Sequence, residues 1–326
     1  MVTGTIGIGV LGCADIAWRK VLPALRADRR VQVVAVASRT GERAAKFAAE
    51  FGCAAVVGYQ GLLDRDDVDA VYLPLPSGLH AEWIRRALAA GKHVLTEKPA
   101  TTSAADTEEL VRLAGAGGLV LMENFMFVHH SRHDRVSRLL AEGAAGAVRS
   151  FHSTFTIPAR PAGDIRLTPE LGGGALLDNG AYPVRAAQLL LGPDLTVAGA
   201  HLMTDPRSGV DVAGSALLYR SDGVTAQLTF GMDHQYVNDY HVHGSGGRLS
   251  VDRAFTPPVD LATEITVARP GGVDRVTLPA EDQCAKTVAA FVTAIRTGAC
   301  PDTGAMLRQA TLIDEIREHA RRSRTT

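Results

Sequence analysis

The sequence predicts a doubly wound α/β domain over residues 1–122, followed by an α+β domain with a large, mostly antiparallel sheet over residues 123–326. The first third of the chain alternates short, continuously apolar segments with helical periodicity. This is typical of parallel strands that are buried on both faces and joined by helices. After residue 122 the chain changes to longer strand-like segments separated by glycine-containing turns, which predict an open-faced antiparallel sheet. With 326 residues, of which 46% are hydrophobic, the chain can bury a core in each domain.

The elements of the first domain follow from apolar periodicity and from glycines at helix ends. Continuous apolar runs predict strands over residues 6–11, 31–37, 70–73, 94–96 and 119–121, with a short strand near Val56. Helical periodicity begins at Asp15, covers residues 41–51 and 79–90, and begins again at Ser103. Gly52 and Gly91 close two of these helices, because glycine readily adopts the backbone conformation that ends a helix.

The second domain is expected to be rich in strands. A helix over residues 131–140 comes first, and a second helix over 175–191 follows Gly172-Gly173-Gly174. Two further helices close the chain. Strands are expected over residues 148–157, 195–203, 211–219, 224–230, 236–243, 248–251, 264–268 and 273–278.

Charge and cysteine usage exclude several classes of partner. The net charge is −1 and charges of opposite sign are interleaved, so we expect neither nucleic acid nor a membrane surface as a partner. The four cysteines lie far apart without a CxxC spacing, which indicates reduced thiols rather than a disulfide framework or a zinc site. The N-terminus lacks the features of a signal peptide, and no apolar run is long enough to span a bilayer. We therefore expect a cytoplasmic protein.

The turn after the first strand, residues 12–17, matches a dinucleotide-binding pattern. It fits G-x-G-x-x-G/A with alanine at the second glycine, so no bulky side chain keeps a pyrophosphate from the backbone N–H groups at the helix start. The alternative is a glycine turn that only packs a strand on a helix, and the α/β context favours the dinucleotide. The expected contacts are Gly12, Cys13, Ala14, Asp15 and Ile16.

The end of the second strand indicates which dinucleotide binds. An Asp or Glu at this position usually holds the ribose 2′-hydroxyl of NAD, whereas this chain has Ser38, Arg39 and Thr40. A hydroxyl and a guanidinium suit a 2′-phosphate, so we expect NADPH/NADP as the cofactor. The alternative is that Arg39 is a solvated loop charge and that both cofactors bind.

Two motifs give the chain a family resemblance. Thr96-Glu97-Lys98-Pro99 ends the fifth strand, and the downstream run from Gly172 to Pro183 reads GGGALLDNGAYP. Together they resemble the Gfo/Idh/MocA oxidoreductase family, and the match covers essentially the whole chain. Within the family, residues 9–25, 75–83, 123–131 and 227–232 are similar to NDP-hexose 3-ketoreductases of deoxysugar biosynthesis.

The resemblance implies a fold and an activity. The fold is an N-terminal Rossmann domain that binds NADP, with a C-terminal domain for the substrate and for oligomerisation. The activity is NADPH-dependent reduction of the C3 keto group of a nucleotide-linked, preferentially dTDP-linked, deoxy-ketohexose to the 3-hydroxyl. Many family members carry His at the position of Tyr182, and the Tyr form also occurs in members that resemble xylose and dihydrodiol dehydrogenases.

Lys98 and Tyr182 are the candidate catalytic residues. Parallel-sheet enzymes bind ligands beyond the carboxyl ends of their strands, so Lys98 should project to the cofactor and the substrate, where an ammonium stabilises a developing alkoxide. Glu97 beside it could orient the lysine. Tyr182 is the other candidate proton donor, since the Lys98 charge favours a partly ionised phenol. An isolated lysine is usually a surface charge and a tyrosine often only packs, but the motifs favour a catalytic role. Which of the two is the principal acid stays open.

The other candidate site residues are assigned by position. Asp178, near the start of the same helix as Tyr182, could accept hydrogen bonds from sugar hydroxyls or from backbone amides. Guanidinium–phosphate pairing and base stacking are the chemistry expected where the second domain meets a nucleotide diphosphate. Leu75, Pro76, His80, Glu97 and Lys98 complete the expected cofactor contacts, and Lys98, Arg166, Asp178, Asn179, Tyr182, His234 and Tyr236 are the expected substrate contacts.

Several histidines suggest a metal but lack the required pattern. His129, His130 and His133 have no carboxylate–histidine spacing around them, so a polar helix start explains them better. His241 and His243 alternate on one strand face, where cross-strand packing is the commoner role. We expect no metal.

Two other functions remain open at this stage. One is an NADP-dependent dehydrogenase of free sugars or trans-dihydrodiols that uses the same residues in oxidation. The other is a non-catalytic dinucleotide sensor. In each case an open antiparallel sheet would expose a wide apolar area to water, so we expect a homodimer or homotetramer formed through the C-terminal sheet.

Overall fold

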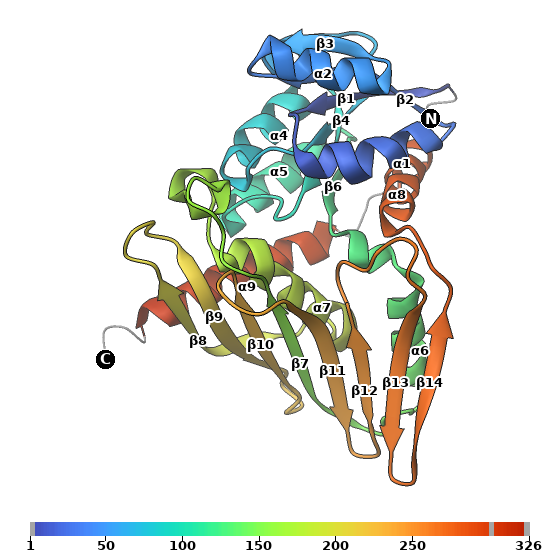
Figure 1. Cartoon of the computed structure of the whole chain (residues 1–326), viewed down its shortest axis with the longest axis vertical. Coiled ribbons are helices and arrows are strands. Elements are labelled where there is room, and N and C mark those ends of the chain that lie inside the picture. The colour runs from blue at the N-terminus through green and yellow to red at the C-terminus, as the bar shows by residue number, and fades with distance from the viewer. Residues whose placement is uncertain (1–3, 300–302, 323–326) are drawn as a thin grey trace. The chain divides into compact units, whose positions relative to one another are not determined.

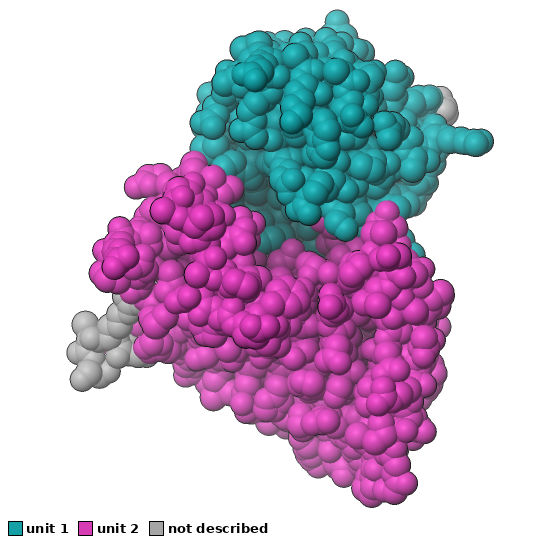
Figure 2. Space-filling view, viewed as in Figure 1, with its two compact units in different colours: residues 1–125, 284–307 teal, residues 126–283, 308–326 magenta. Residues whose placement is uncertain are grey.

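The structure, a computed structural model, describes residues 4–299 and 303–322 (Figure 1). The chain divides into two compact units, which Figure 2 shows in different colours. Unit 1 comprises residues 1–125 and 284–307, and unit 2 comprises residues 126–283 and 308–326. No helix within the described ranges is both long and apolar enough to cross a bilayer.

Unit 1 is built on a six-stranded sheet with the order β3-β2-β1-β4-β5-β6. All of its neighbouring strands pair in parallel, which confirms the predicted doubly wound α/β fold. The winding reverses between β1 and β4, and ligands of such sheets bind beyond the carboxyl ends of the strands at this point. The strands are β1 (Ile6–Leu11), β2 (Val31–Ser38), β3 (Ala54–Val57), β4 (Ala70–Leu73), β5 (His93–Glu97) and β6 (Leu121–Asn124).

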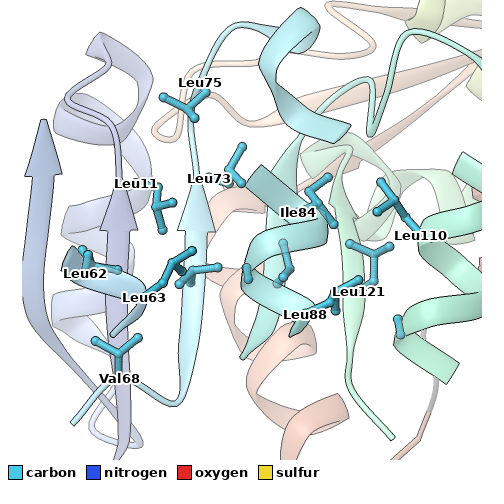
Figure 3. Close-up of a cluster of buried hydrophobic side chains, with 14 of the residues drawn as sticks. Leu11, Leu62, Leu63, Val68, Leu73, Leu75, Ile84, Leu88, Leu110 and Leu121 are labelled. Atoms are coloured by element: carbon cyan, nitrogen blue, oxygen red, sulfur yellow. The ribbon is translucent and has the colours of Figure 1, made fainter. Parts of the chain in front are cut away.

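The helices of unit 1 cover the sheet and share its core. Every residue of β1 and β4 is buried, as expected for strands covered on both faces. Figure 3 shows side chains from several elements meeting in one cluster, with Leu11 from β1, Ile84 from α4 and Leu110 from α5. Complete burial of such a side chain contributes about 1.5–3 kcal/mol. The helices are α1 (Leu22–Ala27), which continues the π-helical turn Ala17–Val21, and α2 (Gly41–Phe51), α3 (Gln60–Leu63), α4 (His80–Ala89), α5 (Ala104–Ala116) and α8 (Gln283–Thr297).

Residues 284–307, which include all of helix α8 except its first residue, belong to unit 1 although the 158 residues 126–283 of unit 2 separate them from its first segment. Val288, Phe291 and Val292 of the helix are buried. Thr293 Oγ1 accepts a hydrogen bond of 3.5 Å from Arg30. The structure therefore differs from the single boundary near residue 122. Helical periodicity shows that a face is buried, but it does not show which sheet covers that face.

Unit 2 is built on an eight-stranded sheet with the order β14-β13-β12-β11-β7-β10-β9-β8. Its neighbouring strands pair antiparallel except β7 and β10, which are parallel, so the predicted mostly antiparallel sheet is confirmed. The strands are β7 (Val148–Thr156), β8 (Thr196–Thr204), β9 (Asp211–Tyr219), β10 (Thr225–Gly231), β11 (Val237–Gly244), β12 (Arg248–Asp252), β13 (Thr263–Arg269) and β14 (Gly272–Leu278).

The two faces of this sheet differ in exposure. In β9, Ala216 and Leu218 are buried, while Leu217 and Tyr219 between and beside them are exposed. Helices α6 (Ser131–Ala141) and α7 (Ala181–Leu191) contact the sheet, and α9 (Thr303–Arg322) ends the described chain (Figure 1). The alternation indicates a sheet with one covered face and one open face.

Candidate active site

The turn that follows β1 can approach a ligand with its backbone. Gly12 has a φ of 125°, and a Cβ at this position would lie 2.9 Å from the Cδ2 atom of Leu75. Only glycine meets both conditions. Its N–H donates a 3.0 Å hydrogen bond to the carbonyl of Ala37, which ties the turn to β2. Asp15 at the helix start is exposed, and Ala14 and Ile16 are half-buried. Asp15 and Ile16 of the predicted pyrophosphate cradle are the first helical residues, so the cradle includes N–H groups of a helix start.

A second helix supports the same turn. Arg43 of α2 donates a 2.7 Å hydrogen bond from Nη2 to the carbonyl of Cys13. The Cys13 side chain is buried, and burial raises the pKa of its thiol. Arg43 was not predicted from the sequence. It lies three residues beyond Thr40, the last residue of the strand-end pattern, and only the fold brings it to the turn.

The end of β2 carries a positive charge and no carboxylate. Ser38 is buried, and its Oγ accepts a 3.4 Å hydrogen bond from the N–H of Thr40. Arg39 is exposed, and it forms no ion pair with the residues that the structure describes. Tyr59 lies near enough for the Arg39 charge to oppose the rise in its pKa that burial causes. These residues fit a ribose 2′-phosphate, as the sequence predicted for NADP.

The end of β5 holds a carboxylate next to Lys98. Glu97 Oε1 accepts two hydrogen bonds of 2.6 Å, one from the Tyr72 hydroxyl on β4 and one from Asn124 Nδ2 on β6. Burial raises the pKa of Glu97, while these two donors and the Lys98 charge act in the opposite direction. Lys98 is half-buried and is joined to Pro99 by a cis peptide bond. The carboxylate is therefore anchored from both neighbouring strands.

The sequence did not single out Tyr72 or Asn124. Asn124 pairs directly with Glu97 in the β5–β6 register, so a polar residue at the end of a buried strand was the available signal. Tyr72 sits inside an apolar run and gave no signal, because its role depends on which strand lies beside β4.

The loop after β4 and the first residue of α4 carry three of the expected cofactor contacts. Leu75 and His80 are buried and Pro76 is half-buried. Leu75 packs against Gly12, so this loop and the turn after β1 lie side by side. The ring nitrogens of His80 face main-chain carbonyls, with Nε2 2.7 Å from that of Leu75 and Nδ1 2.9 Å from that of Pro99.

In unit 2 a glycine loop starts the helix that carries Asp178, Asn179 and Tyr182. The π-helical turn Leu176–Gly180 leads directly into α7. Gly174 has a φ of 118°, and a Cβ there would collide with Oδ1 of Asp211. The other oxygen of Asp211 accepts a 2.6 Å hydrogen bond from the N–H of Leu176. The carboxylate of β9 thus caps the helix start.

The structure brings two of the expected substrate residues together. Arg166 Nε donates a 2.7 Å hydrogen bond to Asp178 Oδ2, and the Arg166 guanidinium also lies 3.3 Å from Asp164. Asn179, next in the chain, is buried, and its Oδ1 has no hydrogen-bond partner among the described residues. These groups provide charge and hydrogen-bonding capacity at one end of α7.

Tyr182 is held in a cluster of aromatic rings. Its ring centroid lies 5.1 Å from that of Phe155 and 5.4 Å from that of Phe255. Tyr236 contacts the same Phe155 ring at 6.4 Å, and its hydroxyl accepts a 3.0 Å hydrogen bond from Asn238. The structure thus joins Tyr182 and Tyr236 in one aromatic wall. His234 is exposed and has no ring contact there. Lys98 belongs to unit 1 and Tyr182 to unit 2, and each unit positions its own residue.

His133, His152 and His243, outside these sites, contact other protein groups. His133 is buried between the Tyr240 hydroxyl at 2.8 Å and the Ala254 carbonyl at 3.2 Å. The His152 and His243 rings lie 4.8 Å apart on neighbouring strands. In the part of the chain that the structure describes, no three His, Cys, Asp or Glu side chains are grouped so that they could hold a metal ion.

Two family models match most of the chain. One is described as an oxidoreductase family with an NAD-binding Rossmann fold and matches residues 6–125. The other is described as the GFO/IDH/MocA C-terminal domain and matches residues 133–250.

Curated relatives and solved structures extend the match. The dTDP-3,4-didehydro-2,6-dideoxy-alpha-D-glucose 3-reductase of Actinomadura kijaniata is 52% identical over 97% of this chain and 96% of the relative. The D-xylose 1-dehydrogenase (NADP(+)) 2 of Haloferax volcanii is 40% identical over 90% of each chain. The crystal structure of KijD10, a 3-ketoreductase from Actinomadura kijaniata in complex with NADP and TDP-benzene, has a TM-score of 0.95 and 52% identity. That match covers 97% of this chain and 98% of the other.

Proposed function

Because the chain belongs to the Gfo/Idh/MocA oxidoreductase family, we propose that it reduces the C3 keto group of a dTDP-linked deoxy-ketohexose to the 3-hydroxyl, with NADPH as cofactor. The observation that carries the proposal is the 52% identity to the Actinomadura kijaniata 3-reductase over 97% of this chain. The KijD10 complex adds support, because it contains NADP and a TDP-linked ligand.

Unit 1 supplies a cofactor site that fits NADPH. The glycine turn at residues 12–17 leaves room for a pyrophosphate, and Ser38, Arg39 and Thr40 suit the 2′-phosphate. Leu75, Pro76, His80, Glu97 and Lys98 complete the proposed contacts. When bound, NADPH supplies the hydride that forms the new C–H bond at C3 of the sugar.

Lys98 stabilises the charge that develops on the substrate oxygen. As the C–H bond forms, the electron pair of the C=O π bond moves to oxygen, and an ammonium that donates a hydrogen bond to that oxygen stabilises it. Glu97, held by Tyr72 and Asn124, keeps a carboxylate beside this ammonium. Either Lys98 or Tyr182 then gives the proton that completes the 3-hydroxyl. Both are proposed as catalytic, and the kinetics of the Lys98 and Tyr182 variants measure how much each contributes to this proton transfer.

The proposed sugar and nucleotide contacts come from unit 2. Asp178 and Asn179 offer acceptors for sugar hydroxyls, and Arg166 offers a guanidinium for the diphosphate. Tyr236, 39% exposed beside Phe155, offers a ring for base stacking, and His234 is the other proposed contact at this position.

The test is NADPH oxidation with a panel of nucleotide-linked and free ketosugars. We expect turnover with a dTDP-linked 3-ketosugar, and a loss in kcat of about 100-fold or more for Lys98→Ala and Tyr182→Phe, because a positioned general acid typically contributes this much. The larger loss identifies the principal proton donor. NADPH binding, followed by fluorescence, should persist in Tyr182→Phe.

The control is Lys92→Ala, since Lys92 precedes the same strand β5 at its opposite end and donates to the Arg65 carbonyl. It should leave kcat unchanged. No turnover with any nucleotide-linked ketosugar would contradict the proposed substrate. Cofactor binding without any turnover would instead favour a dinucleotide sensor.

A second candidate function is an NADP-dependent dehydrogenase of free sugars or dihydrodiols. The 40% identity to the Haloferax volcanii D-xylose 1-dehydrogenase (NADP(+)) 2 favours it. Reduction of NADP with free D-xylose or a dihydrodiol, without reaction of any nucleotide-linked ketosugar, would select this function.

The open face of the unit 2 sheet is the proposed site of homo-oligomer formation. Met203, Leu217 and Tyr219 on β8 and β9 are more than 40% exposed. Apolar groups gathered on one face favour association with a second copy. We also propose the cytoplasm as location, because Cys13 and Cys53 are free thiols. Cell fractionation tests this.

A further inference from the structure

The His80 side chain connects two loops of unit 1. His80 is the first residue of α4, and none of its surface is exposed. Its Nε2 lies 2.7 Å from the carbonyl oxygen of Leu75, in the loop after β4. Its Nδ1 lies 2.9 Å from the carbonyl oxygen of Pro99, in the loop after β5. The first loop carries proposed cofactor contacts, and the second carries Lys98.

These two contacts determine how many protons the His80 ring must carry. A carbonyl oxygen only accepts hydrogen bonds, so both contacts are favourable only when both ring nitrogens carry a proton. A neutral imidazole has one N–H. If that N–H donates to Leu75, Nδ1 presents a lone pair to the Pro99 carbonyl. The hydroxyl of Thr96 lies 3.4 Å from Nδ1 and 3.3 Å from the carbonyl oxygen of Glu97, and turning its single hydrogen from that carbonyl to Nδ1 gives this nitrogen a donor.

The groups around the His80 ring have opposing effects on its pKa. Burial lowers the pKa of His80, and the nearby Lys98 charge acts in the same direction. The carbonyls of Leu75, Pro99 and Ala100 raise it, and the net pKa lies below the ordinary 6.5. The ring therefore gains its second proton only at a pH below the ordinary pKa of histidine.

We propose that His80 is a positioning residue whose imidazole joins the Leu75–Pro76 loop to the Lys98–Pro99 loop and so fixes Lys98 relative to the cofactor. The link to Leu75 is present in both protonation states, and the link to Pro99 is completed by the second proton. This inference rests on the proposed function, since Lys98 and the Leu75 loop take their roles from it.

Two variants separate the links. In His80→Gln the side-chain amide can replace Nε2–H, so the link to Leu75 stays and the link to Pro99 is lost. In His80→Asn the amide can replace Nδ1–H, so the link to Pro99 stays and the link to Leu75 is lost. We expect His80→Gln to keep its affinity for NADPH while kcat falls about tenfold at acidic pH, which is the effect of one charge-assisted hydrogen bond. We expect His80→Asn to weaken NADPH binding by a similar factor.

The pH profile gives the sharpest result. The ratio of kcat between the unmodified enzyme and His80→Gln should rise as the pH falls through the pKa of His80, and should approach one at alkaline pH. A ratio that does not change with pH would overturn the proposal, because a merely structural histidine would lower kcat equally throughout.

A spectroscopic measurement tests the proton requirement without any substrate. In protein labelled with ¹⁵N-histidine, the His80 signals, assigned by their loss in His80→Gln, should show two protonated nitrogens at low pH and one at high pH. Thr96→Val removes the hydroxyl that stabilises the neutral ring and should raise this pKa. One tautomer at every pH, or a pKa that falls in Thr96→Val, would overturn the proposal. If the unmodified protein reduces no ketosugar, the proposed function fails, while NADPH affinity and these spectra still decide the role of His80.

Discussion

Glu97 shows how a single residue keeps a charge at the edge of a buried sheet. The two donors that reach its Oε1 come from neighbouring strands, so the carboxylate does not depend on flexible loops for its partners. Burial still raises its pKa above the ordinary 4.5. An acid with a raised folded pKa binds protons more strongly in the folded state, so its contribution to stability falls as the pH rises from the ordinary value through the folded one.

Tyr72→Phe should make this dependence steeper. The hydroxyl stabilises the ionised carboxyl, so its removal should raise the pKa of Glu97 further and lower the free energy of unfolding at neutral pH by about 1.5–3 kcal/mol. Below pH 4.5, where the carboxyl is protonated in both states, the loss should be smaller. Urea unfolding followed by circular dichroism at both pH values measures the difference.

The matched control is Tyr59→Phe. Tyr59 is a half-buried tyrosine of the same unit that packs edge-on against Trp83, and it is not bonded to Glu97. This variant should change stability little and equally at both pH values. An equal loss for Tyr72→Phe at neutral and acidic pH would show that only packing, and not the charge of Glu97, was affected.

The individual site residues differ in how far the sequence could reveal them. Gly12 and the strand end at Ser38 follow local patterns, and the structure gives both an arrangement that fits NADP. Arg43, Tyr72 and Asn124 act on groups far away in the chain, so their roles emerge only when the strand order is known. The catalytic roles of Lys98 and Tyr182 stay predictions.

At the scale of elements, the start of the helix that bears Tyr182 depends on β9. Asp211 of β9 accepts a hydrogen bond from the N–H of Leu176 and leaves no room for a side chain at position 174. Burial raises the pKa of Asp211, and the N–H of Leu176 opposes that rise. This contact ties the turn that leads into α7, and that carries Asp178, to β9.

Gly174→Ala should disturb this helix start. The alanine would have to adopt a φ of 118° and displace Asp211, and such strain costs about 1–3 kcal/mol. We expect a lower melting temperature and a lower kcat, with NADPH affinity unchanged because unit 1 is not altered.

Gly199→Ala is the control for this substitution, since a Cβ at Gly199 of β8 meets no atom within 4 Å. It should leave the melting temperature and kcat close to those of the unmodified protein. Equal stability of the Gly174 and Gly199 variants would contradict the assigned role of Asp211.

The elements themselves were largely predictable, and their partners less so. Helix α2 has the predicted bounds, and Gly52 after it has the expected positive φ of 66°. Apolar periodicity reports which residues are buried, so it located the strands. It does not report which sheet a helix covers, as α8 shows. It also did not reveal the parallel pairing of β7 with β10, because pairing direction depends on the path of the chain between strands.

At the scale of the whole molecule, the open sheet face decides the predicted assembly. Leu217→Lys places a charge among the exposed apolar residues of β8 and β9, and burying an unpaired charge in an interface is unfavourable. We expect the unmodified protein to have the mass of a dimer or tetramer by light scattering, and the variant to shift toward the monomer.

Val57→Lys controls for added charge, because Val57 is 67% exposed on β3 and belongs to unit 1, whereas the proposed interface belongs to unit 2. It should leave the mass unchanged. A monomeric unmodified protein would contradict the proposed assembly.

Because residues 284–307 belong to unit 1, the two segments of this unit are synthesised at different times, before and after most of unit 2. The ribosome delivers the N-terminus first, so strands β1 to β6 emerge long before the helix that covers their flank. Met306, which joins the same apolar cluster as Leu11, arrives later still. Unit 1 therefore completes its core only after strands β7 to β14 of unit 2 have been synthesised. A gene fragment that stops at residue 125 would encode the dinucleotide turn but leave the surface under α8 in contact with water.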